Sequence, residues 1–277
     1  NVLKDIIDSK AFSVVRLSKI YRQAESSHIV LNAHKINAGE LITLDNKNKD
    51  FFFFEKKDVR SVMGALVYLV KTRLPEYIGA SPFEIQVLTP MRKGELGVEH
   101  LNEVLQYYLN PASESKKEKE GRTGVFREGD KVMQVKNNYK LEWKITNAKG
   151  FSIEEGLGVF NGDMGIIKQI NTYSERITVV FDENREAEYP FSSLDELELA
   201  YAITIHKSQG SEYPAVVLPL LSGPPILCNR NLLYTAITRA QKCVAIAGRQ
   251  SMVEQMIHNE TEQKRYSGLN DCLKEGL

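Results

Sequence analysis

The residues best suited to chemistry form a polar run between two apolar segments in the last third of the chain. Residues 204–212 are Thr-Ile-His-Lys-Ser-Gln-Gly-Ser-Glu. Thr204 and His206 offer donors for phosphate or sugar oxygens, and Glu212 offers an acceptor for a ribose hydroxyl. Gly210 allows a positive φ or a close approach of the backbone to a ligand. Strand, polar turn and strand place such groups at the edge of a sheet, within reach of a ligand. The same pattern is typical of a solvated turn in a hairpin or crossover, so the run alone leaves both interpretations open.

Two arginines are candidates for contact with a transferred phosphate. Arg239 lies near the end of a predicted helix at about 231–240, and Arg22 follows a predicted strand. A guanidinium is planar and permanently charged, which suits stabilisation of a γ-phosphate during transfer. The alternative for Arg239 is that its charge complements the helix dipole. Thr235 and Thr238 near the same face favour the functional interpretation, because β-branched hydroxyl residues are unusual on a surface helix, but spacing alone does not decide.

An α/β framework is expected to position these residues. Asp58 can cap a helix with apolar residues at three-and-four spacing, and Gly39 is expected to end another helix. A strand, a loop and a helix over residues 83–109 imply a crossover and hence a parallel sheet. Strands are predicted at 14–17, 51–54, 83–90, 202–205, 215–220 and 243–247, and helices at 28–38, 59–74, 98–109, 231–240 and after 251.

Short strands separated by turn signals replace this pattern between residues 126 and 193. They indicate a small β-barrel inserted into the α/β domain. The expected organisation is a first α/β part at 1–125, the insertion at 126–193, and a second α/β part with a C-terminal tail at 194–277. The Ser-, Lys- and Glu-rich residues 111–122 are expected to form an exposed connector. The barrel strands are predicted at 130–135, 159–160, 165–170 and 177–181, with turns at Asn137–Asn138, Asn161–Asp163 and Asp182–Asn184.

Composition narrows the class of protein. The chain has 277 residues with 36 basic and 36 acidic side chains, so its net charge is +0. Any contact with nucleic acid should therefore use a local groove rather than a global positive field. No window approaches the roughly 18 apolar residues of a membrane span, and no signal peptide is recognisable. The three cysteines form no zinc or CxxC pattern, which favours reduced thiols and a cytoplasmic protein.

Several elements of a complete triphosphate site are not found in the sequence. There is no G-x-x-x-x-G-K-[ST] run, and the five histidines form no metal cluster. Asp182-Glu183 follows an apolar strand as a magnesium site could require, but its place among short strands favours a hairpin turn. The chain also lacks an initiator methionine. We therefore expect a piece of a longer protein that supplies half of a site and holds no metal by itself.

The motifs resemble those of a known family. Residues 199–214, Leu-Ala-Tyr-Ala-Ile-Thr-Ile-His-Lys-Ser-Gln-Gly-Ser-Glu-Tyr-Pro, are similar to motif V of RecD-like superfamily 1 DNA helicases. Residues 231–240, Asn-Leu-Leu-Tyr-Thr-Ala-Ile-Thr-Arg-Ala, resemble motif VI, and residues 17–23 resemble motif IV. Residues 87–94 resemble the following region that faces DNA, and residues 126–139 and 159–165 resemble the lead into the family's 2B insertion.

This resemblance implies a RecA-like domain 2A that carries an SH3-like barrel, 2B. It also implies an ATP-dependent motor that translocates 5′ to 3′ on single-stranded DNA, with ATP and Mg²⁺ as cofactors. The Mg²⁺ ligands would lie in the N-terminal domain 1A, whose motifs I to III are absent here. We therefore expect this chain alone not to hydrolyse ATP. The implied partners are single-stranded DNA, domain 1A and a RecBCD-like nuclease complex; no membrane is implied. The implied site residues are Arg22 and Arg239 at the γ-phosphate, Gly210 and Glu212 at the ribose, and Thr204 and His206 at DNA phosphates, with Thr89, Arg92, Lys93, Asn137 and Asn138 as weaker DNA contacts.

Two other classes remain open from the sequence. A non-catalytic nucleic-acid-binding module could use the barrel alone, and a scaffold subunit could retain the helicase fold for protein contacts. A scaffold has no need to keep Arg22, Gly210, Glu212 and Arg239 together, which speaks against the second alternative.

Overall fold

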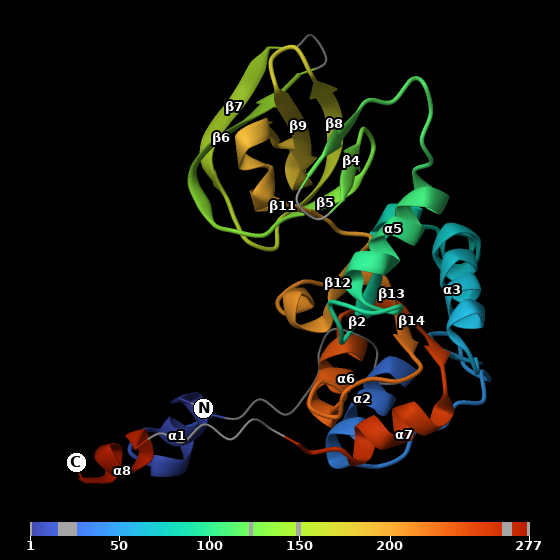
Figure 1. The fold of residues 1–277 in the computed structure, drawn as a ribbon. Coiled ribbons are helices and arrows are strands. Elements are labelled where there is room, and N and C mark those ends of the chain that lie inside the picture. Colours follow the sequence, from blue (N-terminus) through green and yellow to red (C-terminus); the bar gives the residue numbers. More distant parts are fainter. Residues whose placement is uncertain (1, 16–26, 122–123, 148–150, 262–267, 276–277) are drawn as a thin grey trace.

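Two large β-sheets, one parallel and one antiparallel, organise the part of the chain that the structure describes. The computed structural model describes residues 2–15, 27–121, 124–147, 151–261 and 268–275. Figure 1 shows the antiparallel sheet curled into a barrel above the α/β domain. The predicted fold class, a parallel α/β sheet with an inserted β-barrel, is confirmed.

The parallel sheet has five strands in the order β1, β14, β13, β2, β12. Each neighbouring pair is parallel. All five strands therefore end at the same edge of the sheet, which matters for the site below. Their bounds are β1 Phe51–Glu55, β2 Ile85–Thr89, β12 Ala202–Thr204, β13 Tyr213–Leu220 and β14 Ala240–Gly248.

Helices cover both faces of this sheet because successive strand side chains point to opposite sides. Val216 and Leu218 of β13 pack in one core with α2 (His28–Ala38), α6 (Arg230–Ile237) and α7 (Gln250–His258). Val217 packs in the other core with α3 (Val59–Tyr68), α4 (Leu74–Ile78) and α5 (Val98–Leu109). The buried sheet is thus a rigid base for the loops at its two edges.

Two of the predicted helices match the structure at both ends. Helices α2 and α5 have the predicted bounds, and Gly39 ends α2 with a φ of 77°. The Asp58 carboxylate accepts a hydrogen bond from the Ser61 backbone N–H at 2.8 Å, as expected of an N-cap. The helix predicted at 59–74 instead runs through a π-helical segment, η1 (Leu69–Arg73), and on to α4. Apolar spacing alone did not reveal that irregular turn.

The antiparallel sheet has seven strands in the order β11, β5, β8, β9, β10, β6, β7. The turn predicted at Asp182 is confirmed, because the 3-10 turn η3 (Asp182–Asn184) joins the antiparallel pair β9 and β10. Strand β11 lies beyond residue 193 and pairs with β5, and the domain limits proposed from the sequence stay a prediction. The bounds are β5 Lys131–Gln134, β6 Asn138–Thr146, β7 Ser152–Val159, β8 Met164–Asn171, β9 Arg176–Phe181, β10 Glu186–Pro190 and β11 Leu197–Leu199.

Three parts of the barrel region differ from the prediction. Strands β6 and β10 were not predicted, and β7 extends far upstream of the predicted 159–160. Asn138, placed in a turn, is the first residue of β6. The connector at 111–122 contains β3 (Glu118–Glu120), which pairs with β4 (Val125–Arg127). These strands carry many charged residues on an exposed face, so their hydrophobic signal is weak.

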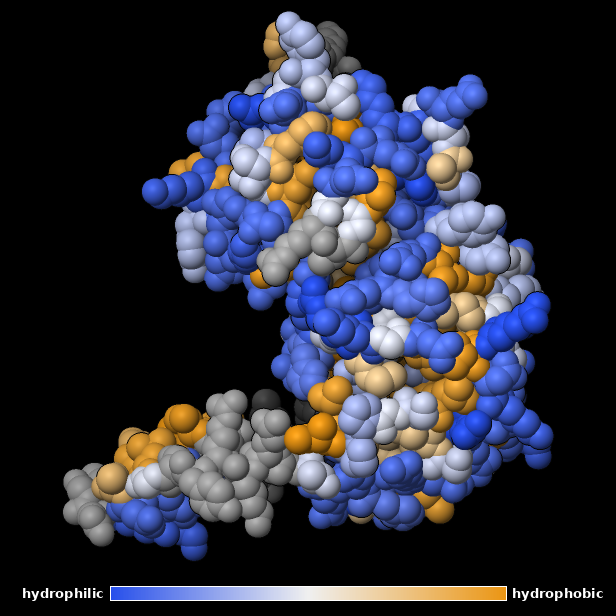
Figure 2. Space-filling view, viewed as in Figure 1, coloured by the Kyte–Doolittle hydropathy of each residue, from blue (hydrophilic) through white to orange (hydrophobic). Residues whose placement is uncertain are grey.

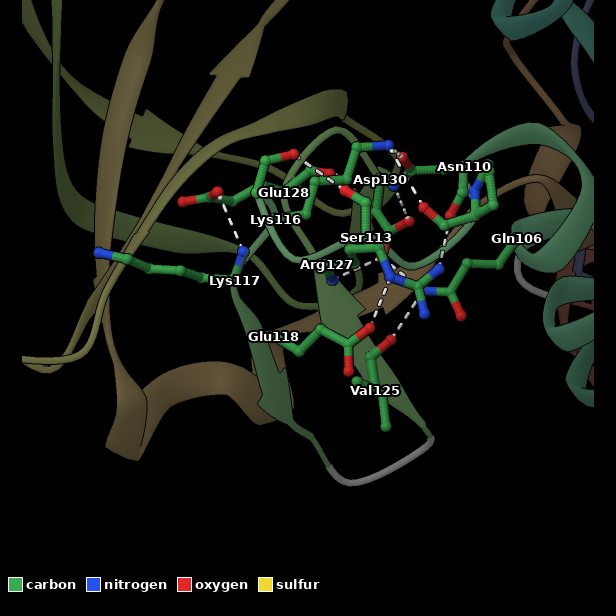
Figure 3. A network of polar contacts seen from close by, with 12 residues as sticks. Gln106, Asn110, Ser113, Lys116, Lys117, Glu118, Val125, Arg127, Glu128 and Asp130 are labelled. Atoms are coloured by element: carbon green, nitrogen blue, oxygen red, sulfur yellow. Dashed lines mark hydrogen bonds and ion pairs between the residues drawn. The ribbon is translucent and has the colours of Figure 1, made fainter.

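A buried polar network fixes the barrel to α5 (Figure 3). The Asp130 carboxylate is fully buried and accepts hydrogen bonds from Gln106 Nε2 at 2.6 Å, Asn110 Nδ2 at 2.7 Å and the Tyr201 hydroxyl at 2.9 Å. Burial raises the pKa of Asp130, although these hydrogen bonds act in the opposite direction. Arg127 donates from Nε to Glu118 at 2.6 Å and ties β4 to β3. The hydrogen bonds from Gln106 and Asn110 to the buried Asp130 carboxylate would break if the barrel moved away from α5, so the network resists that motion.

The first and last described helices form a separate pair. Helix α1 (Val2–Ser9) contacts α8 (Leu269–Glu275), and Figure 1 shows the pair apart from both sheets. Val2 and Leu3 are 64% and 65% exposed, and Figure 2 shows apolar surface on this pair. No helix within the described ranges is long and apolar enough to cross a membrane.

Candidate functional site

The polar run singled out in the sequence crosses the parallel sheet from one edge to the other. Thr204 ends β12 and is in register with Thr89 at the end of β2. Tyr213 begins β13 and is in register with Ala240 at the start of β14. Residues 204–212 therefore start at the carboxyl edge of the sheet and finish at its amino edge. The two edges are about 15 Å apart across the five-residue strand β2.

A short 3-10 turn presents His206 at the carboxyl edge. Thr204 caps this turn, η5 (Ile205–Ser208), because its hydroxyl oxygen accepts from the Lys207 backbone N–H at 3.3 Å. The Ser208 hydroxyl is buried and donates to the Ile205 carbonyl at 2.7 Å. His206 is exposed and Thr204 half-buried. The turn thus has a buried side that fixes it and an outer side that can meet a ligand.

Gly210 and Glu212 lie on the way to the amino edge. Gly210 has a φ of 91°, a conformation that side chains with a Cβ rarely adopt. Open space surrounds the position where its Cβ would be, so a ligand can approach the backbone there. The Glu212 carboxylate is exposed and accepts from Gln241 Nε2 at 3.2 Å.

Arg239 is held beside this loop at the amino edge. It lies in the link between α6, which ends at Ile237, and β14, so it follows the helix rather than ending it as predicted. Its Nη1 donates to the Ser211 carbonyl at 3.2 Å and its Nε to the Thr235 carbonyl at 3.2 Å. Its own carbonyl accepts from the Tyr213 N–H at 2.9 Å. The contact with Thr235 fits the alternative prediction, a charge at the end of the helix, and the phosphate contact of Arg239 stays a prediction.

The weaker candidates for DNA contact at the end of β2 and in the loop after it differ in exposure and in hydrogen-bond partners. Thr89 is fully buried, and its hydroxyl donates to the Leu96 carbonyl at 2.7 Å. This corrects the prediction that Thr89 contacts DNA, because the side chain shapes the loop from inside instead. Lys93 is exposed. Arg92 is 44% exposed and makes a two-pronged ion pair with Glu198, at 2.6 Å from Nη2 and 3.3 Å from Nη1.

The two asparagines form hydrogen bonds within the barrel region. Asn137 Oδ1 accepts from the Asn161 N–H at 2.9 Å. Asn138 Nδ2 donates to the two carboxylate oxygens of Glu196 at 3.0 and 3.3 Å. Both side chains are thus hydrogen-bonded within the barrel region, and their role toward DNA stays a prediction.

Sequence reasoning missed Glu198. This carboxylate, on the barrel strand β11, also contacts Lys207 Nζ at 3.4 Å. Burial by itself would raise the pKa of Glu198, but the hydrogen bond from Arg92 and the charge of Lys207 outweigh it, and the net effect lowers the pKa. Glu198 is 106 positions from Arg92 in the chain, so no local pattern could have indicated the pair.

The remaining predicted site residue, Arg22, lies outside the described residues. Within the described ranges, no group of three or more His, Cys, Asp or Glu side chains could hold a metal ion. Two cavities of about 630 and 610 Å³ lie on the β6–β7 face of the barrel and beside α5, and neither is lined by Thr204, Gly210 or Arg239.

Comparison with known proteins yields two family matches. A family described as the SH3 domain of ATP-dependent RecD-like DNA helicases matches residues 101–181, from α5 to β9. A family described as the UvrD-like helicase C-terminal domain matches residues 199–247, which include the Thr204–Glu212 run and Arg239. The matches thus cover the barrel strands from β5 to β9 and the part of the α/β domain that carries the candidate site.

Individual relatives are longer than this chain. The ATP-dependent RecD2 DNA helicase of Deinococcus radiodurans is 33% identical over 240 residues, which cover 87% of this chain and 29% of that protein. The RecBCD enzyme subunit RecD of Mycolicibacterium smegmatis is 30% identical over 191 residues, 69% of this chain and 29% of that protein. A crystal structure of Pif1 helicase from Bacteroides in complex with ADP-AlF3 and ssDNA matches at 20% identity and a TM-score of 0.49, covering 88% of this chain and 54% of that chain.

The chain spans less than a third of the length of these two curated relatives. Its two matched regions occur in the order and at the places where the motifs were found. The chain therefore belongs to the RecD-like superfamily 1 helicases, of which it contains the C-terminal region with the SH3 domain and the UvrD-like domain.

Proposed function

We propose that this chain is the second RecA-like half of an ATP-driven DNA helicase, and that residues 204–212 connect its grip on DNA to its contact with ATP. One observation carries the proposal. A single loop begins with Thr204 and His206 at the carboxyl edge of the sheet and reaches Glu212 at the amino edge. A change at either end can be passed to the other through nine residues, several of which are hydrogen-bonded to one another.

The amino edge would meet the nucleotide. Arg239 would reach the γ-phosphate, since its guanidinium is already held by carbonyls of Ser211 and Thr235 and loses little freedom when it binds. Glu212 and the open backbone at Gly210 would hold the ribose. Bound Mg²⁺ would neutralise charge on the phosphates, and its ligands would come from domain 1A, as would the Walker lysine. Arg22 is proposed as a second phosphate contact from the family resemblance alone.

The carboxyl edge would meet single-stranded DNA. Thr204 and His206 would hydrogen-bond phosphates of the DNA. Arg92 and Lys93 would contact phosphates further along the same DNA strand. Phosphate contacts carry no sequence preference, which suits a motor that must move along any sequence. The 5′ to 3′ direction is proposed from the family resemblance. The motor role is the same for a helicase that acts alone and for one inside a RecBCD-like nuclease complex.

The test is ATP hydrolysis by the full-length protein with Arg239→Ala, at saturating single-stranded DNA. Loss of a phosphate-contacting arginine is expected to lower turnover by about 10³-fold or more. Arg249→Ala is the matched control. Arg249 follows β14 at the opposite edge of the sheet, where its Nη2 donates to the Lys57 carbonyl at 2.7 Å, so its loss should leave turnover near normal. Near-normal turnover in Arg239→Ala would refute the assignment.

A further inference from the structure

Glu198 brings together three elements that the sequence keeps far apart. It projects from the barrel strand β11, in register with Met133 of β5. Its carboxylate contacts Arg92, from the loop after β2, and Lys207, from the turn η5. Figure 1 shows that the chain passes from β11 in the barrel directly to β12 in the α/β domain. A single barrel side chain thus holds two cations of the other domain.

The carboxylate of Glu198 is less exposed to solvent than the two cations that it contacts. The Glu198 side chain is 18% exposed, against 44% for Arg92 and 28% for Lys207. Both cations lie beside the edge that carries Thr204 and His206, because Lys207 is next to His206 in η5 and Arg92 follows the end of β2. A two-pronged guanidinium–carboxylate pair has the geometry that a guanidinium–phosphate pair also uses.

We propose that Glu198 is a positioning residue that occupies Arg92 and Lys207 in the DNA-free protein and is exchanged for a phosphate of single-stranded DNA when the strand binds. This inference rests on the proposed function. In it, the backbone phosphate displaces a carboxylate that the barrel carries, so DNA binding releases a contact between the barrel and the α/β domain. The contact between the barrel and the α/β domain therefore differs between the DNA-free and the DNA-bound protein.

The exchange predicts the effect of removing only the charge of Glu198. Glu198→Gln keeps the shape and one acceptor oxygen but leaves no competing carboxylate. The full-length protein with this change should bind fluorescein-labelled oligothymidine about threefold to fivefold more tightly at low salt, which corresponds to the upper part of the range for ion pairs near the surface. In the wild type the released carboxylate takes up a cation, whereas a glutamine does not. Between about 50 and 200 mM NaCl, the slope of log K against log salt should therefore be steeper for Glu198→Gln than for the wild type.

Glu99→Gln is the charge-matched control. Glu99 is 40% exposed and lies 3.5 Å from Arg92 Nε, so this change removes the same charge from the same neighbourhood and leaves the Glu198 contacts intact. It should change affinity by less than about twofold. A double-mutant cycle adds a second readout: Arg92→Gln should weaken DNA binding more in the Glu198→Gln background than in the wild type. A merely structural role for Glu198 would not produce that coupling.

The outcomes separate the inference from the function on which it rests. Equal affinity and slope for Glu198→Gln and Glu99→Gln, in a protein that binds DNA, would overturn the exchange and leave the motor intact. Absence of DNA binding by the wild type would overturn both. Weaker binding by Glu198→Gln would also overturn the exchange. If that variant does not fold, Glu198→Asp, which keeps the charge but shortens the reach, should show tighter binding to a smaller extent, and unchanged binding would contradict the proposal.

Discussion

Lys131 should make the stability of the wild-type chain rise between about pH 7 and pH 9.5, and Lys131→Met should remove that rise. Lys131 is 6% exposed at the junction of the two sheets. Its ammonium donates to the Phe83 carbonyl at 2.7 Å and to Gln86 Oε1 at 2.8 Å. Burial lowers the pKa of Lys131 from 10.5 to about 8, although the charges of Asp182 and Glu84 act to raise it.

The sign and size of this change in stability follow from the different proton binding of Lys131 in the folded and unfolded chain. Between the folded pKa of about 8 and the unfolded pKa of 10.5, the unfolded chain binds more protons at this site, so stability rises as the pH rises. The cost of holding the charged lysine is fully present below pH 8 and disappears above pH 10.5. The whole difference corresponds to about 3 kcal/mol. The part gained between pH 7 and pH 9.5 is about 2 kcal/mol.

Urea unfolding followed by circular dichroism measures this difference. Both proteins are compared at each pH, so that titration of other groups cancels. Stopping near pH 9.5 avoids the buried tyrosines, because burial raises the pKa of Tyr189 and Tyr201 above the usual value for tyrosine. The gap between wild type and Lys131→Met should shift by about 2 kcal/mol in favour of the wild type as the pH rises. Parallel curves for the two proteins would refute the reasoning.

Two more results are expected. The full-length protein should bind single-stranded DNA in a salt-sensitive way, and His206→Ala should weaken that binding, as measured by fluorescence anisotropy. An affinity that is independent of salt would argue against backbone contacts. Asp58→Ala should lower the urea midpoint of unfolding, because it removes the hydrogen bond to the Ser61 N–H at the start of α3, and an unchanged midpoint would contradict the capping role.

The fold was predictable where a helix shows a regular apolar face or a clear end signal. Helix α5 has apolar residues at regular spacing, and α2 ends at a glycine, so both bounds were found. The β6–β7 hairpin was missed because alternate positions such as Lys140, Glu142 and Lys144 are charged and its exposed face resembles a loop. Its stability comes from pairing across the barrel, which a local window does not contain.

Part of the candidate site could also be predicted from the sequence, and part required the structure. The Thr204–Glu212 run and Arg239 were found from residue type, and the sheet topology supplies what the sequence could not, namely that the run joins two edges. Thr89 was misjudged because a threonine at a strand end gives no sign of whether it points inward. Glu198 gave no signal, since an acidic residue in a short strand acquires its role only when distant loops fold against it.

The central claim is that Arg239 acts on the phosphate that ATP transfers. The most direct measurement is the steady-state kinetics of the full-length Arg239→Ala variant at saturating single-stranded DNA, with kcat and KM for ATP determined separately. A contact made mainly in the transition state predicts a fall in kcat of about 10³-fold, with a much smaller change in the binding of ATP. A variant that keeps its kcat and loses only affinity for ATP would contradict the account.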